Sequence, residues 1–223
     1  MLLQLLNKLN QHINLIMVIT SKDSLNQALT SAGYKNLSEY RQKMIKQIQY
    51  ANFLLDYIDD HFDDVFNDYY QQCAPKYVSL IKISVSDTSS PTDDETSKLN
   101  EVKELISNTD KSFGDIAQDY SNDSTSSKKG SLGIVDSKDT SGIANSYGKD
   151  VFNAIEALSE GQVSDVITGD NGYYFVKVTS TDKKTLKKEL KKTDIDSPLL
   201  AYDDYLQYVV YNSYKINYKD KDN

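Results

Sequence analysis

The stretch Lys128-Lys129-Gly130-Ser131-Leu132-Gly133 lies where a polar part of the chain gives way to a short apolar one. Residues 121–129 are polar and turn-rich, and residues 132–135 predict a short strand. The stretch therefore marks the entry of a predicted strand near the middle of the chain.

Further strands and helices are predicted on both sides of this entry. β-rich alternation predicts a strand over 77–85, and two more strands, 163–167 and 173–179, are joined by a glycine-containing turn. Apolar residues at helical spacing predict three helices, over 99–106, 113–120 and 151–158, whereas 136–148 show no periodicity. The order β-α-α-β-α-β-β predicts an α+β module of about 100 residues.

The residues before this module are predicted to be helical. Leucine and isoleucine recur at helical spacing over 2–16, which predicts an amphipathic helix. That segment lacks a basic start and a small-residue cleavage site, so it does not fit a signal peptide. Asn36 and Glu39 resemble a capping box, and apolar steps of three and four from Tyr40 to Ile58 predict a long helix.

Aspartates cluster after this helix, between residues 56 and 68. They suggest a metal or acid–base site, but a calcium loop needs a glycine turn and fixed ligand spacing, which are missing here. A solvated helix face is the expected role of these carboxylates.

Composition narrows the function further. The formal net charge of −8 argues against a nucleic-acid partner, because phosphate contacts need clustered cations. Cys73 is the only cysteine and the chain has two histidines, so we expect no intrachain disulfide, no metal and no cofactor. The sequence contains no run of 18 or more apolar residues, so no membrane-spanning segment is predicted.

Lysines cluster after the module, with six lysines and one glutamate between 183 and 192. Leu186 and Leu190 give this run a helical pattern, and the helical character continues toward a polar tail at 215–223. The cluster has two interpretations, contact with an anionic surface such as lipid or cell-wall polymer, or one solvated helix face.

Motifs in the module resemble those of the parvulin family of peptidyl-prolyl isomerases. They occur in the family's order, at 113–121, 128–133, 157–164 and 171–178. The helical flanks also resemble the PrsA-type foldases of Gram-positive bacteria. The resemblance implies three parts. Residues 1–77 and 182–223 form one helical, chaperone-like lobe made from both chain ends, and residues 78–181 form an inserted parvulin-like domain, a four-stranded antiparallel sheet with helices.

The resemblance also assigns a cleft, residue by residue. The family's two facing histidines fall on Lys82 and Tyr174, its central Asp or Cys on Asp123, and a polar position on Asn171. These four are the candidate catalytic residues. The candidate substrate-binding residues, for the proline ring, are Leu132, Val151 and Phe152, the family's phenylalanine falling on one of the last two.

The replacement of both histidines bears on activity. We expect Lys82 and Asp123 to form an ion pair across the cleft, since opposite charges a few ångströms apart hold each other ionised. Such a site has lost the neutral histidine network, so weak isomerase activity, or none, is predicted. Alternatively, Tyr174 packs on its sheet, Lys82 extends to water and Asp123 caps a turn.

Three functions follow as hypotheses. The first is a parvulin-type isomerase that assists the folding of exported proteins; the second is a non-catalytic holdase with a degenerate parvulin domain; the third is a structural or adhesive surface protein. The resemblance implies unfolded or partly folded exported proteins as partners and allows a homodimer. It also implies a place on the outer face of a Gram-positive cell membrane, through a lipoprotein anchor that these residues do not contain.

Overall fold

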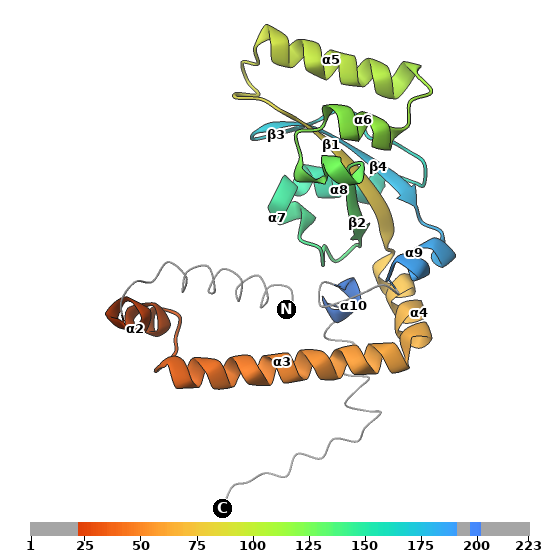
Figure 1. Cartoon of the computed structure of the whole chain (residues 1–223). Helices are drawn as coiled ribbons and strands as arrows, with labels where there is room; N and C mark the ends of the chain where they lie inside the picture. Colours follow the sequence, from red (N-terminus) through yellow and green to blue (C-terminus); the bar gives the residue numbers. More distant parts are fainter. Residues whose placement is uncertain (1–21, 191–196, 202–223) are drawn as a thin grey trace, which may run out of the picture. The chain divides into compact units, whose positions relative to one another are not determined.

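The computed structural model describes residues 22–190 and 197–201 (Figure 1). The helix predicted over 2–16 and the tail at 215–223 lie outside the described residues. The chain divides into two compact units, one of Met1–Asp68 with Leu190–Asn223 and one of Tyr69–Glu189.

The described part of the first unit is helical. Its helices are α2 (Lys22–Ser31), α3 (Leu37–Asp60), most of α4 (Phe62–Cys73) and α10 (Pro198–Ala201). Asn36 caps α3, as predicted, by accepting a hydrogen bond from the Glu39 backbone N–H at 2.9 Å. The capping box itself does not form, because the Glu39 carboxylate accepts from the N–H of Lys35 rather than from that of Asn36. Leu54, Tyr57 and Ile58 bury one side of α3.

The second unit is built on one antiparallel sheet, which confirms the predicted α+β class. Its strands are β1 (Lys76–Ser84), β2 (Ser131–Val135), β3 (Ile167–Gly169) and β4 (Gly172–Ser180), in the spatial order β2-β1-β4-β3. The strand predicted at 163–167 is wrong in its position. Only Val163 makes an isolated bridge, to Lys177, and the paired residues begin at Ile167, where the tight turn to β4 fixes the register.

Helices cover both faces of this sheet (Figure 1). α5 (Asp93–Asn108) and α6 (Phe113–Tyr120) pack on the face that carries Ile81 and Ile83, and α7 (Ile143–Tyr147) and α8 (Lys149–Ala157) pack on the face that carries Val78 and Leu80. Successive strand residues point to opposite faces, so alternate β1 positions enter different cores. The later helix α9 (Lys183–Leu190) confirms the helical pattern of the lysine-rich run.

The quoted glycine stretch brings three elements together. Gly130 has φ +75°, and a Cβ there would lie 2.4 Å from the Leu80 carbonyl oxygen and 2.8 Å from the Ala117 Cβ. The Gly130 carbonyl accepts a hydrogen bond from the Leu80 N–H at 2.8 Å. Only a residue without a side chain fits between β1 and α6 at this point, which explains the glycine at the strand entry.

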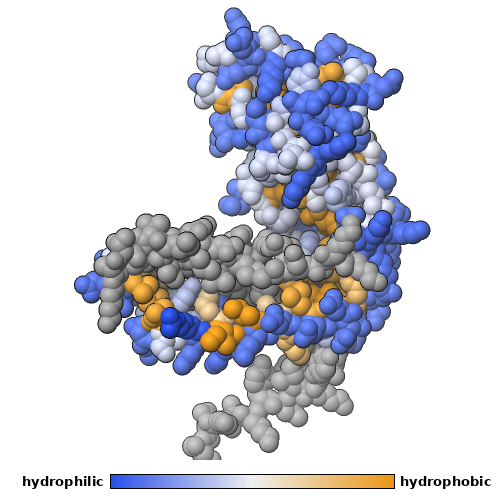
Figure 2. All heavy atoms as spheres, viewed as in Figure 1, coloured by the Kyte–Doolittle hydropathy of each residue, from blue (hydrophilic) through white to orange (hydrophobic). Residues whose placement is uncertain are grey.

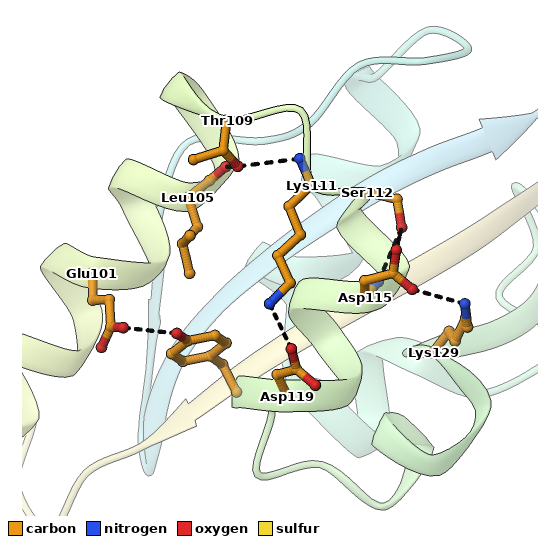
Figure 3. Close-up of polar contacts among 9 residues, drawn as sticks. Glu101, Leu105, Thr109, Lys111, Ser112, Asp115, Asp119 and Lys129 are labelled. Carbon is orange, nitrogen blue, oxygen red and sulfur yellow. Dashed lines mark hydrogen bonds and ion pairs between the residues drawn. The ribbon is translucent and has the colours of Figure 1, made fainter.

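Polar contacts tie the helical layer of α5 and α6 together at the surface (Figure 3). The Tyr120 hydroxyl donates to Glu101 Oε1 at 2.7 Å, linking α6 to α5. Asp115, in the first turn of α6, accepts from Lys129 Nζ at 2.7 Å. Solvent reaches both contacts, so they contribute little to stability compared with the buried core beneath them.

Candidate active-site cleft

A pocket of about 440 Å³ opens on the α7–α8 side of the sheet. Its wall is formed by α7, the start of α8, the β3–β4 turn and Tyr174 of β4. Three of the predicted site residues line it: Val151, Asn171 and Tyr174. Val151 and Tyr174 are buried and give the pocket an apolar floor, whereas Asn171 is exposed at the mouth.

The other two predicted proline-binding residues do not line this pocket. Leu132 and Phe152 are half-buried and pack against the same hydrophobic cluster as Val151. Leu132 and Phe152 therefore support the residues that form the floor of the pocket and do not line it themselves. Of the two candidates for the family's phenylalanine position, Val151 is the one that reaches the pocket.

Lys82 and Tyr174, the two positions on which the resemblance places the family's histidines, lie on one face of the sheet. They are paired residues of β1 and β4, and the Lys82 Nζ lies 5.7 Å from the centroid of the Tyr174 ring. An ammonium over an aromatic face is attracted by the ring's negative π-surface. The Tyr174 hydroxyl donates to Asn171 Oδ1 at 2.7 Å, so three of the four candidate catalytic residues are adjacent.

Asp123 is occupied by local hydrogen bonds. Its Oδ1 accepts from the Thr125 N–H at 2.9 Å and from the Thr125 hydroxyl at 2.7 Å, capping the short 3-10 helix Ser124–Lys128. The expected ion pair with Lys82 is not formed, since the ion pairs between described residues do not include these two. The reason is geometric, because Asp123 turns toward its own helix start and the Lys82 ammonium toward the ring across the sheet.

Tyr147 is a cleft residue that the sequence did not reveal. It ends α7, a helix inside the stretch predicted to be aperiodic, and its ring stands nearly perpendicular to that of Tyr174 with centroids 6.2 Å apart. Its hydroxyl donates to Asp123 Oδ1 across a long 3.4 Å contact. α7 is too short for a periodic signal, and the signal available was Asp139, whose carboxylate accepts from the N–H groups of Ile143 and Ala144.

Both phenols of the cleft are neutral donors near neutral pH. Burial raises the pKa of Tyr147 to about 12, and the Asp123 carboxylate adds to this rise. Burial, followed by Asp123 and Asp170, also raises the pKa of Tyr174. The cleft thus offers an apolar floor at Val151 and Tyr174 and two phenolic hydroxyls, while Lys149, Asp150 and Asp170 line its polar wall. The residues lining the pocket include no histidine.

No described group is arranged for metal chemistry. Within 22–190 and 197–201, no set of three or more His, Cys, Asp or Glu side chains is placed to hold a metal ion. What the cleft can do chemically is hold a small apolar ring against Val151 and Tyr174 and direct hydroxyl donors at the adjoining backbone.

Comparison with known proteins supports the same interpretation. The family model described as "Rotamase: PPIC-type PPIASE domain" matches residues 80–180. Foldase protein PrsA of Staphylococcus epidermidis is 32% identical over 132 residues, which cover 56% of this chain and 38% of that protein. A Foldase protein PrsA of Staphylococcus aureus matches with the same identity and coverage. These alignments thus span well under half of the relatives' length.

Among solved structures, the crystal structure of PrsA from Bacillus subtilis aligns with 98% of this chain and 86% of its own. The TM-score is 0.42 and the sequence identity 22%, so this likeness adds nothing to the assignment. The assignment rests on the match to the family model and on the 32% identity to the staphylococcal proteins. The four-stranded sheet and its pocket agree with it. Residues 80–180 are therefore a parvulin domain of the PPIC type, in a chain that is similar to the staphylococcal PrsA foldases over 132 residues.

Proposed function

We propose that this protein is a peptidyl-prolyl cis–trans isomerase that assists the folding of exported proteins. The observation that carries the proposal is the pocket floored by Val151 and Tyr174, inside a domain that matches the PPIC-type family over 80–180. The two curated relatives described above are named as foldases, which supports the same activity for this chain.

Catalysis of this reaction requires a site that binds the prolyl ring and surroundings that favour the twisted amide, and it requires no cofactor. Rotation about the X–Pro amide meets a barrier of about 18–20 kcal/mol because resonance keeps the amide planar. The uncatalysed reaction takes tens of seconds at room temperature. A catalyst must bind the twisted amide more tightly than the planar one.

The cleft residues divide this task. Val151 and the Tyr174 ring hold the prolyl ring and exclude water, which favours the less polar twisted amide. The Tyr147 ring stands against Tyr174 and forms a side wall for the prolyl ring, and its hydroxyl, which contacts Asp123 at a long 3.4 Å, is a minor donor to the substrate backbone. Lys82 holds the Tyr174 ring from the β1 side, and Asn171 fixes that residue's hydroxyl.

We expect the activity to be modest. The family's two histidines are replaced by Lys82 and Tyr174, and Asp123 is engaged in capping. What remains is substrate positioning and desolvation, without the histidine network.

A blocking substitution tests the proposal. Thr168 is an exposed residue of the pocket wall on the edge strand β3, and Thr168→Trp places a bulky ring at the mouth. Wild-type protein should accelerate cis–trans exchange of a prolyl tetrapeptide, measured by NMR exchange spectroscopy, and Thr168→Trp should reduce kcat/KM at least about tenfold. Thr179→Trp, at an exposed position of β4 outside the pocket, is the control. The proposal fails if wild-type protein does not exceed the uncatalysed rate.

The holdase is the second candidate function, and an apolar surface in the first unit supports it. Ile45 and Ile48 on α3 are 55% and 49% exposed, and apolar atoms gather over this helix in Figure 2. Exposed apolar patches are typical of protein-binding surfaces. We propose that residues 1–77 and 182–223 form the lobe that holds unfolded clients through this helix. Ile45→Asn with Ile48→Asn should then weaken the suppression of client aggregation without changing peptide isomerisation.

We place the protein outside the cytoplasm, on the outer face of a Gram-positive membrane and held there by a lipid anchor. This proposal rests on the likeness to the staphylococcal foldases. In the part of the chain that the structure describes, no helix is both long enough and apolar enough to cross a bilayer. Cell fractionation with antibody detection would locate the native protein, and detergent extraction of the membrane fraction would show whether it is held there by a lipid anchor. Light scattering of the purified protein would show whether it dimerises.

A further inference from the structure

Helix α9 presents lysines on a fixed support. Its eight residues contain four lysines and one glutamate. Leu186 and Leu190, four residues apart, are 0% and 2% exposed and hold one side of the helix in the protein interior. At about 100° per residue, Lys184 and Lys188 lie on the opposite side, and both are exposed.

The start of this helix is anchored to the strand before it. Asp182 Oδ2 accepts from the Thr185 N–H at 2.7 Å and from the Thr185 hydroxyl at 2.9 Å, so this carboxylate serves as the N-terminal cap. The N–H and hydroxyl of Thr181 both donate to Glu160 Oε2, at 2.9 and 2.8 Å. The lysines are therefore displayed by a helix whose N-terminal end is fixed.

The arrangement of the charges is not one that stabilises the helix. Lys184 and Lys188 form a like-charge pair at spacing i,i+4, and Lys183 and Lys187 form another, and such pairs destabilise a helix slightly. Hydrogen bonds from Thr185, and after them the nearby Lys184, lower the pKa of Asp182, so Lys184 has one carboxylate in its neighbourhood. The ion pairs between described residues involve Lys43, Lys111 and Lys129 and do not include Lys184 or Lys188. Helix stability alone therefore does not account for this face.

We propose that the Lys184–Lys188 face of α9 is a docking surface for an anionic phospholipid bilayer. Lysine ammonium groups are compact point charges without the bidentate geometry of arginine, so a row of them suits a diffuse layer of phosphodiester headgroups. The net charge of −8 does not cancel the positive charge of this face, because salt screens charges beyond about 8 Å at physiological ionic strength.

Vesicle co-sedimentation of the full chain tests this surface. The probes are vesicles of phosphatidylcholine alone and vesicles with 30 mol% phosphatidylglycerol, at low and at physiological salt. Wild-type protein should bind only the anionic vesicles, less at the higher salt. Lys184→Glu with Lys188→Glu should lower the partition coefficient at least about tenfold, given the contribution of each lysine near such a membrane.

The matched control reverses two lysines elsewhere, Lys46→Glu with Lys128→Glu, both exposed and both outside α9. It changes the net charge by the same amount, so it should lower the partition coefficient less than about threefold. Equal losses in the two double variants, equal binding to neutral vesicles, or binding to soluble polyphosphate with none to vesicles would each overturn the proposal. Circular dichroism and thermal unfolding of every variant exclude misfolding as the cause.

Discussion

Lys82 and Tyr174 are paired across β1 and β4, with the ammonium of the first 5.7 Å from the ring centroid of the second. They occupy the two positions at which the parvulin resemblance places histidines. The ammonium is attracted by the negative face of the ring, and neither side chain is an imidazole. The chemistry of the cleft should therefore differ from that of a histidine pair in its response to pH.

Isomerase activity should be nearly independent of pH between 6 and 9. The residues lining the pocket include no histidine, and the pKa values of Tyr147 and Tyr174 are raised by burial, so both phenols stay protonated through this range. We expect kcat/KM to vary by less than about twofold, measured by NMR exchange in buffers of constant ionic strength. A bell-shaped profile centred near pH 6.5 would contradict this and would point to a histidine in the reaction.

Tyr147 should act mainly through its ring. Tyr147→Phe keeps the ring beside Tyr174 and loses only the long contact to Asp123, so kcat/KM should fall by less than about threefold. Tyr147→Ala removes the wall of the pocket and should lower kcat/KM at least about tenfold, chiefly through KM.

Tyr120→Ala is the matched control for that experiment. Tyr120 is also half-buried and its hydroxyl also bonds a carboxylate, but it packs on the α5–α6 face of the sheet, away from the pocket. It should lower thermal stability to a similar degree and leave KM unchanged. If both alanine variants raise KM alike, Tyr147 has no specific part in binding.

Gly130 should be far less tolerant than Gly133, although both have positive φ. A Cβ at Gly130 would lie 2.4 Å from the Leu80 carbonyl oxygen, whereas a Cβ at Gly133 would have no neighbour within 4 Å. Gly133→Ala therefore costs backbone strain alone, about 1–2 kcal/mol of unfolding free energy. Gly130→Ala adds a clash with β1 and should cost at least about 3 kcal/mol, measured by urea unfolding. Similar losses in the two variants would show that β1 moves away at little cost.

The protein should lose stability in alkali because of a buried network at the end of α4. The Tyr69 hydroxyl donates to Asp136 Oδ2 at 2.7 Å. Burial raises the pKa of Tyr69, and the Asp136 carboxylate is the next largest cause of this rise. Burial raises the pKa of Cys73 to about 11 from its ordinary value of 9.0. A folded-state pKa above the unfolded one stabilises the fold fully below the unfolded value and loses that effect as pH rises.

The expected window follows from these two groups. The free energy of unfolding should be constant up to about pH 9, fall from there toward pH 11 as unfolded Cys73 ionises, and fall further above pH 10 as unfolded Tyr69 ionises. Cys73→Ala should remove the first part of this decline, which denaturant unfolding at pH 7, 9 and 10.5 can show. An unchanged slope in Cys73→Ala between pH 9 and 10 would contradict the assignment.

The elements of the domain were largely predictable, because each is specified by local patterns. Apolar spacing located α5, α6 and α8, and alternation located β1 and β4. The position of β3 was predicted wrongly, since Val163 and Val166 are apolar without being paired in the strand; they pack against the core instead. α7 was missed, since five residues are too few to show a period.

By itself the sequence determined the α+β order, the place of the glycine entry at Gly130 and the face of α9 that carries lysine, because periodicity and backbone freedom are properties of neighbouring residues. Only the tertiary structure decided that Tyr147 reaches the cleft, and that Lys82 meets the Tyr174 ring rather than Asp123. These partners are more than 20 residues apart in sequence. Which of them meet depends on how β1 and β4 align and on where α7 packs against the sheet, and no local pattern records that.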